Sequence, residues 1–431
     1  MRRGEDLAAP GAETLERSDT MRWRRREDDR GATTEPDALA VAPLGARLEG
    51  VRRIAVLRAG GLGDLLFTLP AIRALSAAYP DAEVTLLGTR LAADLLQRRE
   101  GSPHRVVPLP VVPGVGADPG ERGDGPGIAT FLEQQRLVGY DLAAQMHGGG
   151  RFSNAFLLEL GARCTIGTRT PDAAQLDRSI DYVYSQHEVM RWLEVAGLVG
   201  AAPVELEPRV GVTEIERELG ESFRGEDRRP MVAMHPGATD PRRRWPVSHF
   251  AELATELARE GVRVVLIGSA DDERRLCGRI VDALGFDAAA TGLVEDASGR
   301  LPMPELVGLL SAADVMVGND SGPRHLAQAV GTRTASIFWC GNMLNAGPFP
   351  RQRHRTRISW TARCPVCGID CTPERVAVER CEHDVSFVDD VPVEAVLADV
   401  RELLAGAHSD PEAGSDPAIR SGPAARTHPA R

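Results

Sequence analysis

The chain contains no lysine, so all 51 of its basic residues are arginine, and 62 acidic residues give a formal net charge of −11. This balance excludes a generally basic nucleic-acid binder, and we expect no nucleic-acid partner. Any binding of phosphate by a basic side chain therefore falls to arginine, whose planar guanidinium group suits phosphate oxygens.

Long apolar runs are also absent. No stretch approaches the roughly 18 residues of a membrane span, and the first 50 residues contain no apolar core of a signal peptide. We therefore expect a cytosolic protein. Hydrophobic residues make up 42% of the chain and charged residues 26%, which is typical of a soluble protein with a full core. A length of 431 residues suggests two or three domains.

The composition changes along the chain in a way that predicts domain boundaries. Residues 1–50 and 406–431 carry blocks of charge with few large aliphatic side chains, and we expect a disordered leader and a disordered tail. Residues 206–230 are charged and irregular, which suits a linker. Strand and helix patterns alternate in the two remaining segments, 51–205 and 231–405.

This alternation predicts an α/β fold. Residues 53–57 form a continuous apolar run, which is typical of a strand buried on both faces of a parallel sheet, and a helical pattern follows over 65–78. The pattern restarts with a strand over 231–234 and a helix over 248–260. Two such blocks predict two doubly wound, Rossmann-like domains with a ligand site in a cleft between them.

Glycines follow the first predicted strand in the segment RAGGLGDLLFTLP, residues 58–70. Gly61 and Gly63 fit the start of a dinucleotide fingerprint, but Leu66 breaks it and the carboxylate of Asp64 would repel a pyrophosphate. A carboxylate at the carboxyl end of a strand suits a general base. A helix cap is the alternative role of Asp64, because aspartate is favoured at helix N-termini.

A second segment, HPGATDPRRRWP, follows the strand over 231–234. Its three consecutive arginines, 242–244, can neutralise a diphosphate through charge-assisted hydrogen bonds. A run of arginines is otherwise a solvated surface feature. Its place at a strand's carboxyl end in an acidic protein favours the binding role.

A third segment, VGNDSGPRHLA over residues 317–327, predicts a strand followed by a helix whose N-terminus is exposed. The free N–H groups and the helix dipole favour an anion such as phosphate. The side chains of Asp320 and Ser321 have a second interpretation as simple helix caps, and that of His325 as a structural group.

The three segments together resemble glycosyltransferase family 9, the family of ADP-heptose:lipopolysaccharide heptosyltransferases. GGLGDLLFTLPAIRAL is similar to the opening segment of that family, HPGATDPRRRWP to its His-x-(Gly/Ala)-(Ser/Thr) segment, and NDSGPRHLA to its Asp-(Thr/Ser)-Gly-x-x-His-Leu-Ala segment. The resemblance runs from about residue 52 to residue 404.

The resemblance implies a GT-B architecture, in which two Rossmann-like domains face each other across a cleft. The N-terminal domain then holds the acceptor, and the C-terminal domain holds a nucleotide-diphospho-sugar such as ADP-heptose. Transfer inverts the anomeric centre and requires no cofactor and no catalytic metal. The acceptor is an envelope glycolipid or polysaccharide precursor, which implies a cytoplasmic enzyme with transient contact to the inner face of the cytoplasmic membrane.

The resemblance also implies roles for individual residues. Asp64 matches the general base, and Gly61 and Gly63 lie on the acceptor side of the same turn. His147 and Arg151 lie where the family contacts the acceptor, although a packing role for the glycines between them is an alternative. The expected donor-binding residues are Thr239, Arg243, Asp272, Glu273, Asp320, Ser321, Gly322 and His325.

Four of the seven cysteines are bunched near the C-terminus: Cys364, Cys367, Cys371 and Cys381. An odd total in a chain without an export signal argues against a disulfide scaffold. The spacing CPVC is that of a zinc knuckle, but the second half lacks such a pair. A structural zinc ion and free or disulfide-paired thiols both remain open, with an iron–sulfur cluster behind them.

Other functions remain open on the sequence. A GT-B-like epimerase or phosphorylase would use the same donor without an acceptor, and a non-catalytic scaffold would bind the donor without turnover. The carboxylate of Asp64 argues against the scaffold, which has no use for a base. A Rossmann dehydrogenase is disfavoured by the broken fingerprint.

Overall fold

The computed structural model describes residues 45–97, 99, 103–371 and 381–409. The predicted leader up to residue 44 and the predicted tail from residue 410 lie outside the described residues. Residues 45–50, which we expected in the leader, belong to the N-terminal domain, because the Gly45 N–H donates to the Gly197 carbonyl at 2.8 Å and Leu48 packs on the core. The last helix continues to Ser409, beyond the predicted start of the tail.

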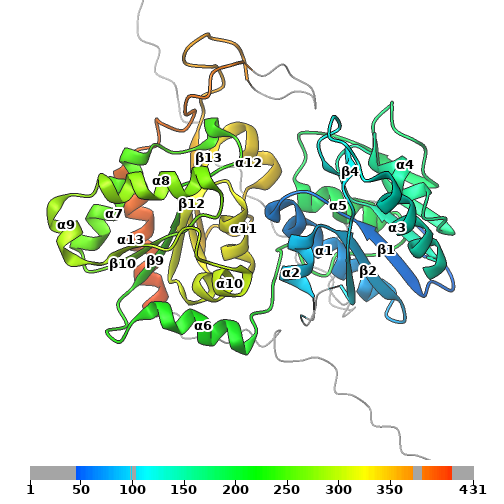
Figure 1. Cartoon of the computed structure of the whole chain (residues 1–431), viewed down its shortest axis with the longest axis horizontal. Coiled ribbons are helices and arrows are strands. Elements are labelled where there is room, and N and C mark those ends of the chain that lie inside the picture. The colour runs from blue at the N-terminus through cyan, green and yellow to red at the C-terminus, as the bar shows by residue number, and fades with distance from the viewer. Residues whose placement is uncertain (1–44, 98, 100–102, 372–380, 410–431) are drawn as a thin grey trace, which may run out of the picture. The chain divides into compact units, whose positions relative to one another are not determined.

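The N-terminal domain, coloured blue to green in Figure 1, is built on a parallel six-stranded sheet. Its strand order is β3-β2-β1-β6-β7-β8. All of β1 except its first residue is buried, as its apolar run predicts. The strands are β1 (Arg53–Leu57), β2 (Glu83–Gly88), β3 (Arg105–Pro108), β6 (Leu142–Gln145), β7 (Cys164–Arg169) and β8 (Arg178–Asp181), with the short pair β4 (Val112–Pro113) and β5 (Gly116–Ala117) outside the sheet.

The C-terminal domain repeats this topology in the order β11-β10-β9-β12-β13-β14, again parallel throughout. Its strands are β9 (Met231–His235), β10 (Arg263–Leu266), β11 (Val294–Asp296), β12 (Val315–Asn319), β13 (Arg333–Trp339) and β14 (His354–Ser359). The order is that of the Rossmann fold. The prediction of two doubly wound α/β domains is therefore confirmed.

Helices connect the strands of both sheets. Among the described residues, no helix combines the length and the apolar character that crossing a membrane would require. The helices of the first domain are α1 (Leu62–Ala78), α2 (Arg90–Leu96), α3 (Gly125–Val138), α4 (Ser153–Leu158) and α5 (Glu188–Gly197). Those that follow are α6 (Glu214–Arg224), α7 (Val247–Arg259), α8 (Asp271–Asp282), α9 (Phe286–Thr291), α10 (Met303–Ala312), α11 (Gly322–Ala329), α12 (Cys340–Ala346) and α13 (Val393–Ser409).

The predicted linker contains a helix that the charge pattern concealed. Thr213 caps α6 through its side chain, which accepts from the Glu216 N–H, and Glu216 accepts from the Thr213 N–H in return. A Cβ at Gly220 would lie 2.3 Å from the carbonyl oxygen of Gly308 in α10. Helix α6 therefore packs backbone to backbone on α10, and residues 206–230 are not irregular throughout.

The strand order places the candidate residues. In each sheet the order reverses between two neighbouring strands, β1 and β6 in the first and β9 and β12 in the second. Ligands of doubly wound folds bind outside the carboxyl ends of the strands at this point. The loops that start there carry Asp64, His147, the arginine run and Asp320.

Candidate functional site

Asp64 lies in the first turn of α1, and both of its carboxylate oxygens have partners. Oδ2 accepts from the Gly61 N–H at 2.9 Å, and Oδ1 accepts from Nη2 of Arg58 at 2.8 Å. The side chain is nevertheless 50% exposed. The capping role considered for Asp64 is therefore real, and each oxygen keeps a further lone pair with which it can accept a proton from a bound molecule.

Arg58, to which the sequence analysis gave no role, holds Asp64 in place. Its side chain is buried against the ring of Trp192, with its guanidinium carbon 4.9 Å from the ring centre. Nε donates to the backbone carbonyl of Asp64 at 3.0 Å, and Nη1 donates to that of Met146 at 2.7 Å. Arg58 therefore ties the loop after β1 to the loop after β6. Its position at the start of the glycine segment is the signal that could have identified it.

Gly60 controls the position of the Asp64 carboxylate, and we expect Gly60→Ala to lower kcat at least tenfold. Its φ is +101°, and a Cβ there would lie 2.7 Å from Oδ2 of Asp64. The matched control is Gly50→Ala, at φ +66° with no atom near the added Cβ. Both variants should lose about 1–2 kcal/mol of unfolding free energy, measured in urea. A loss of kcat in the Gly50 variant would contradict the conclusion that Gly60 acts through the position of the Asp64 carboxylate.

His147 lies at the same sheet edge as Asp64, as expected, but Arg151 does not join them. Burial, and then the charge of Arg58, lower the pKa of His147 to about 4, so its imidazole is neutral at pH 7. Its Nδ1 atom is buried without a hydrogen-bond partner among the described residues. The Arg151 side chain is 68% exposed and pairs with Asp172 at 3.4 Å.

A buried amide that the sequence analysis missed shapes the His147 loop. Gln145, the last residue of β6, is fully buried. Its Nε2 donates to the His147 carbonyl and to Oγ of Ser153, and its Oε1 accepts from the Thr168 N–H at 3.1 Å. These bonds fix the path of the glycine turn that follows.

In the C-terminal domain, Arg243 forms an ion pair with the buried carboxylate of Asp320. Nη1 of Arg243 donates to Oδ2 of Asp320 at 2.9 Å, and Asp320 is only 3% exposed. Burial opposes the ionisation of Asp320, but the hydrogen bond from His325 and the charges of Arg243 and Arg324 outweigh it and lower the pKa of Asp320. Two predicted donor-binding residues are thus in direct contact.

The tautomer of His325 follows from its second partner, Arg324. The Arg324 guanidinium can only donate, so Nδ1 of His325 accepts from Nη1 at 3.0 Å and Nε2–H donates to Oδ1 of Asp320 at 2.8 Å. Burial lowers the pKa of His325, which keeps this imidazole neutral, and lowers that of Arg324 to about 10. Two guanidinium groups around one carboxylate leave an excess of positive charge behind the N-terminus of α11.

Ser321 leaves the N-terminus of α11 free of a side-chain cap. Its Oγ is hydrogen-bonded to Nδ1 of His235 at 2.9 Å and makes no bond to the helix. The N–H groups of the first turn and the dipole of α11 are therefore available to an anion. Gly322 opens this turn, and Thr239 is exposed in the loop that carries Arg243.

The three consecutive arginines have different partners. Arg242 pairs with Asp240 at 2.6 Å and stacks on Trp339, whereas Arg244 pairs with Asp272 at 2.6 Å. Arg243 alone reaches Asp320. Arg243 is thus the member of the run that lies beside α11.

Of the two neighbouring acids expected to bind the donor, Asp272 and Glu273, the second has a structural role. Its Oε1 meets Nε2 of His235 at 3.1 Å, and its Oε2 accepts from the N–H groups of Ser269 and Ala270 at 2.7 and 3.1 Å. Burial opposes ionisation of this carboxyl, but these bonds lower its pKa to about 2. Both oxygens are occupied. Those of Asp272 also have partners, Nη2 of Arg244 and the Glu273 N–H, but its side chain is 39% exposed against 19% for Glu273.

Contacts between the domains bring the two candidate regions together. A Cβ at Gly63 would lie 3.1 Å from Cδ2 of His325, and one at Gly322 would lie 2.9 Å from Cβ of Leu62. The rings of Phe67 and His325 meet edge to face at 4.7 Å. The N-terminus of α1, which carries Asp64, therefore contacts the N-terminus of α11.

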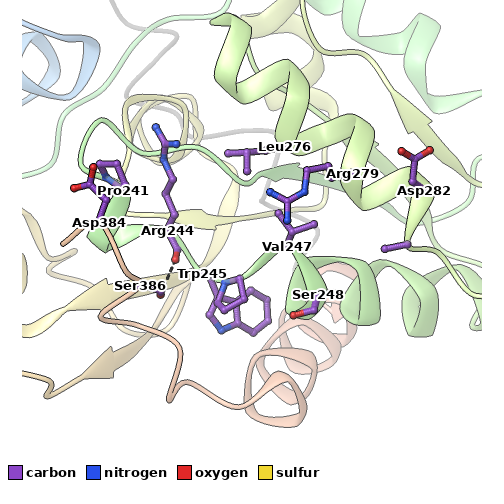
Figure 2. A pocket seen from close by; sticks show the side chains of 12 residues that line it. Pro241, Arg244, Trp245, Val247, Ser248, Leu276, Arg279, Asp282, Asp384 and Ser386 are labelled. Atoms are coloured by element: carbon purple, nitrogen blue, oxygen red, sulfur yellow. Dashed lines mark hydrogen bonds between the residues drawn. The ribbon is translucent and has the colours of Figure 1, made fainter. Parts of the chain in front are cut away.

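A pocket of about 730 Å³ lies beside the arginine run, at the first turn of α7 and along α8 (Figure 2). Arg244 and Ser386 form one wall, where Oγ of Ser386 donates to the Arg244 carbonyl at 2.7 Å. Arg243 and Asp320 are not among its lining residues. This pocket is therefore a neighbour of the expected diphosphate site and does not coincide with it.

The cysteine cluster differs in one member from the predicted set. The atoms that lie within 4.8 Å of one another belong to Cys364, Cys367, Cys381 and His383. The thiol of Cys371 lies 3.9 Å from that of Cys381 and donates to the Ile369 carbonyl, and it is not a member of this group. His383 follows Cys381 closely in the sequence, but spacing alone could not choose it over Cys371.

Comparison with known proteins identifies the family. The model described as glycosyltransferase family 9 (heptosyltransferase) matches residues 129–367 of this chain. Lipopolysaccharide heptosyltransferase 2 of Salmonella typhimurium is 28% identical over 365 residues, which cover 76% of this chain and 97% of that protein. The Escherichia coli protein of the same name is 27% identical over 310 residues, which cover 66% of this chain and 82% of the relative.

Solved structures agree on the fold. Escherichia coli ADP-heptose lipopolysaccharide heptosyltransferase II matches with a TM-score of 0.63 and 22% identity, covering 83% of this chain and 99% of that chain. A family 9 glycosyltransferase of Veillonella parvula matches with a TM-score of 0.67 and 15% identity, covering 84% of this chain and 100% of that chain. The GT-B architecture expected from the sequence is confirmed.

Proposed function

Because this chain belongs to glycosyltransferase family 9, we propose that it transfers a heptose from ADP-heptose to a hydroxyl of a lipopolysaccharide core acceptor. The relatives that cover most of its length are named for heptosyl transfer to lipopolysaccharide. The observation that carries the proposal for the site is the contact between α1, which presents Asp64, and α11, whose uncapped N-terminus lies beside Arg243.

The donor diphosphate binds at the N-terminus of α11. Backbone N–H groups of that turn and the guanidinium of Arg243 hold the phosphate oxygens, and the hydroxyl of Thr239 adds a further donor. Asp320 orients Arg243 through their 2.9 Å bond, with His325 holding the other carboxylate oxygen. As the sugar leaves, this positive region stabilises the negative charge that develops on the diphosphate.

The acceptor hydroxyl binds beside Asp64. The carboxylate takes the hydroxyl proton while the acceptor oxygen forms a bond to the anomeric carbon. The bond from that carbon to the diphosphate oxygen breaks, and its electron pair leaves with the nucleoside diphosphate. Attack from the side opposite to the leaving group inverts the anomeric centre. The base, Asp64, and the groups that stabilise the leaving diphosphate, Arg243 and the N-terminus of α11, all belong to the protein. The step is therefore proposed to proceed without a catalytic metal.

His147 is proposed to contact the acceptor as a neutral hydrogen-bonding group, because its pKa of about 4 keeps it uncharged at pH 7. The side chain of Arg151 is exposed and can contact an acidic acceptor, but its ion-pair partner is Asp172 and it does not lie with Arg58 and Asp64. A lipid-linked acceptor would bring this enzyme to the inner face of the cytoplasmic membrane.

The test is product formation by the full chain from ADP-heptose and lipopolysaccharide core acceptor. Proton NMR of the product should show an anomeric configuration opposite to that of the donor, at a rate unchanged by added Mg²⁺ or Mn²⁺. Thermal melting with ADP, GDP, UDP, dTDP and NAD identifies the nucleotide, since a ligand at about 100 times its Kd adds about 2.7 kcal/mol.

The other outcomes separate the remaining functions. Release of free sugar without an acceptor would indicate an epimerase or phosphorylase. Stabilisation by a nucleoside diphosphate without any turnover would indicate a scaffold, and a response to NAD alone would indicate a dehydrogenase. Each of these results would overturn the proposed transfer.

A further inference from the structure

The cluster that follows β14 has the composition and the spacing of a metal site outside the transfer chemistry. Its four potential ligand atoms lie within 4.8 Å of one another, three on cysteines and one on a histidine. In a tetrahedral zinc site, Zn–S bonds of about 2.3 Å place sulfur atoms about 3.8 Å apart. The cluster therefore needs only a small contraction to close around an ion.

The first two cysteines lie on a turn whose backbone suits thiolate ligands. The Gly368 N–H donates to the Cys364 carbonyl and the Cys364 N–H to that of Ile369, both at 2.9 Å. The φ of Gly368 is +73°, which favours glycine at this position.

His383 provides an independent indication of a ligand. Its Nδ1 is buried and makes no hydrogen bond within the described part of the chain. A buried polar atom without a partner is costly, and a metal bond to the imidazole nitrogen would satisfy it. The thiol of Cys371, by contrast, already has a hydrogen-bond partner, because it donates to the Ile369 carbonyl at 3.4 Å.

We propose that one structural Zn²⁺ ion is held tetrahedrally by four side chains: Cys364, Cys367, Cys381 and His383. Three thiolates and one imidazole form a closed set with no open position for substrate, which is the pattern of structural zinc. The same donor set can accept Fe²⁺, so the measurement must distinguish the two metals.

The ion stabilises the chain that supports the arginine run. Directly after His383, Oγ of Ser386 donates to the Arg244 carbonyl and the Phe387 N–H donates to the Arg242 carbonyl, both at 2.7 Å. Before the first cysteine, the Thr361 carbonyl accepts from Nε1 of Trp339 at 2.7 Å. Bound metal therefore ties the segment that bonds the carbonyls on both sides of Arg243 to the segment that contacts Trp339, on whose ring Arg242 lies.

Metal analysis of the full chain tests the site. Protein purified with reducing agent should contain one zinc per chain by inductively coupled plasma mass spectrometry. Cys367→Ser and His383→Ala should reduce this more than tenfold, whereas the matched control Cys371→Ser should retain it. A chelator that removes the ion should expose three additional thiols to a thiol reagent, a readout that does not depend on any variant's folding.

The results that would overturn the proposal are distinct. Zinc below about 0.1 per chain in protein expressed with zinc and iron supplements would exclude the site, as would a disulfide found by mass under non-reducing conditions. One iron per chain would show that the site binds iron and would overturn the assignment of zinc. Loss of zinc in Cys371→Ser with retention in His383→Ala would show that Cys371, and not His383, is the fourth ligand.

Discussion

Asp64→Asn is expected to lower kcat by about 100- to 10,000-fold, the range contributed by a positioned general base. Asparagine keeps the shape of the side chain and can still accept the N–H of Gly61 or of Arg58. It cannot take a proton from the acceptor hydroxyl. Donor binding should stay within about twofold, because Asp64 lies on α1 and the diphosphate site on α11. Steady-state kinetics and calorimetric titration with ADP measure the two effects.

The matched control for this substitution is Asp124→Asn. Asp124 caps α3 by accepting the Gly127 N–H at 3.1 Å, so it shares the capping role of Asp64 without the bond to Arg58. Its substitution should leave kcat unchanged. Equal losses in both variants would mean that Asp64 acts only as a cap, and full activity of Asp64→Asn would exclude it as the base.

Arg243→Met is expected to lower kcat/KM by about 100- to 1,000-fold and to weaken ADP binding about 10- to 100-fold. The first figure is the effect of removing one group that stabilises developing charge, and the second follows from a charge-assisted hydrogen bond worth about 1.5–3 kcal/mol. The substitution also leaves Asp320 buried with His325 as its remaining bonded partner among those described. Calorimetry with ADP and transfer kinetics test both figures.

Two further variants separate binding from folding. Arg243→Lys keeps the positive charge beside Asp320 and should fall between the wild type and Arg243→Met. Arg259→Met removes an exposed arginine that pairs with Glu256, and should leave ADP binding unchanged. Unaltered ADP affinity in a folded Arg243→Met variant would remove Arg243 from the donor site.

Two neutral histidines, His147 and His325, contribute no charge to the candidate site at pH 7. Burial holds the pKa values of both His147 and His325 below their ordinary range, so neither imidazole adds a positive charge at pH 7. The positive potential at α11 therefore comes from Arg243, Arg324 and the helix dipole. These charges persist to high pH, since even the buried Arg324 has a pKa of about 10.

The sequence by itself determined the fold and the edge at which the site lies. Buried parallel strands read as continuous apolar runs, and their carboxyl ends meet at one sheet edge, so Asp64 and His147 on one sheet could be placed together from the order of elements. For Arg243 and Asp320, it was the resemblance to family 9 that assigned both residues to one donor site. Local patterns are sufficient here because each segment directly follows its strand.

The contacts of the individual side chains in the arginine run, the acidic pair and the cysteine cluster could be learned only from the tertiary structure. Arg242, Arg243 and Arg244 are identical in chemistry, and their partners come from segments between two and 77 residues away. In the same way, Glu273 is bonded to His235 and Asp272 to Arg244, and His383 takes the place of Cys371 in the cysteine cluster. Burial and hydrogen-bond direction depend on contacts distant in the chain, which no local pattern encodes.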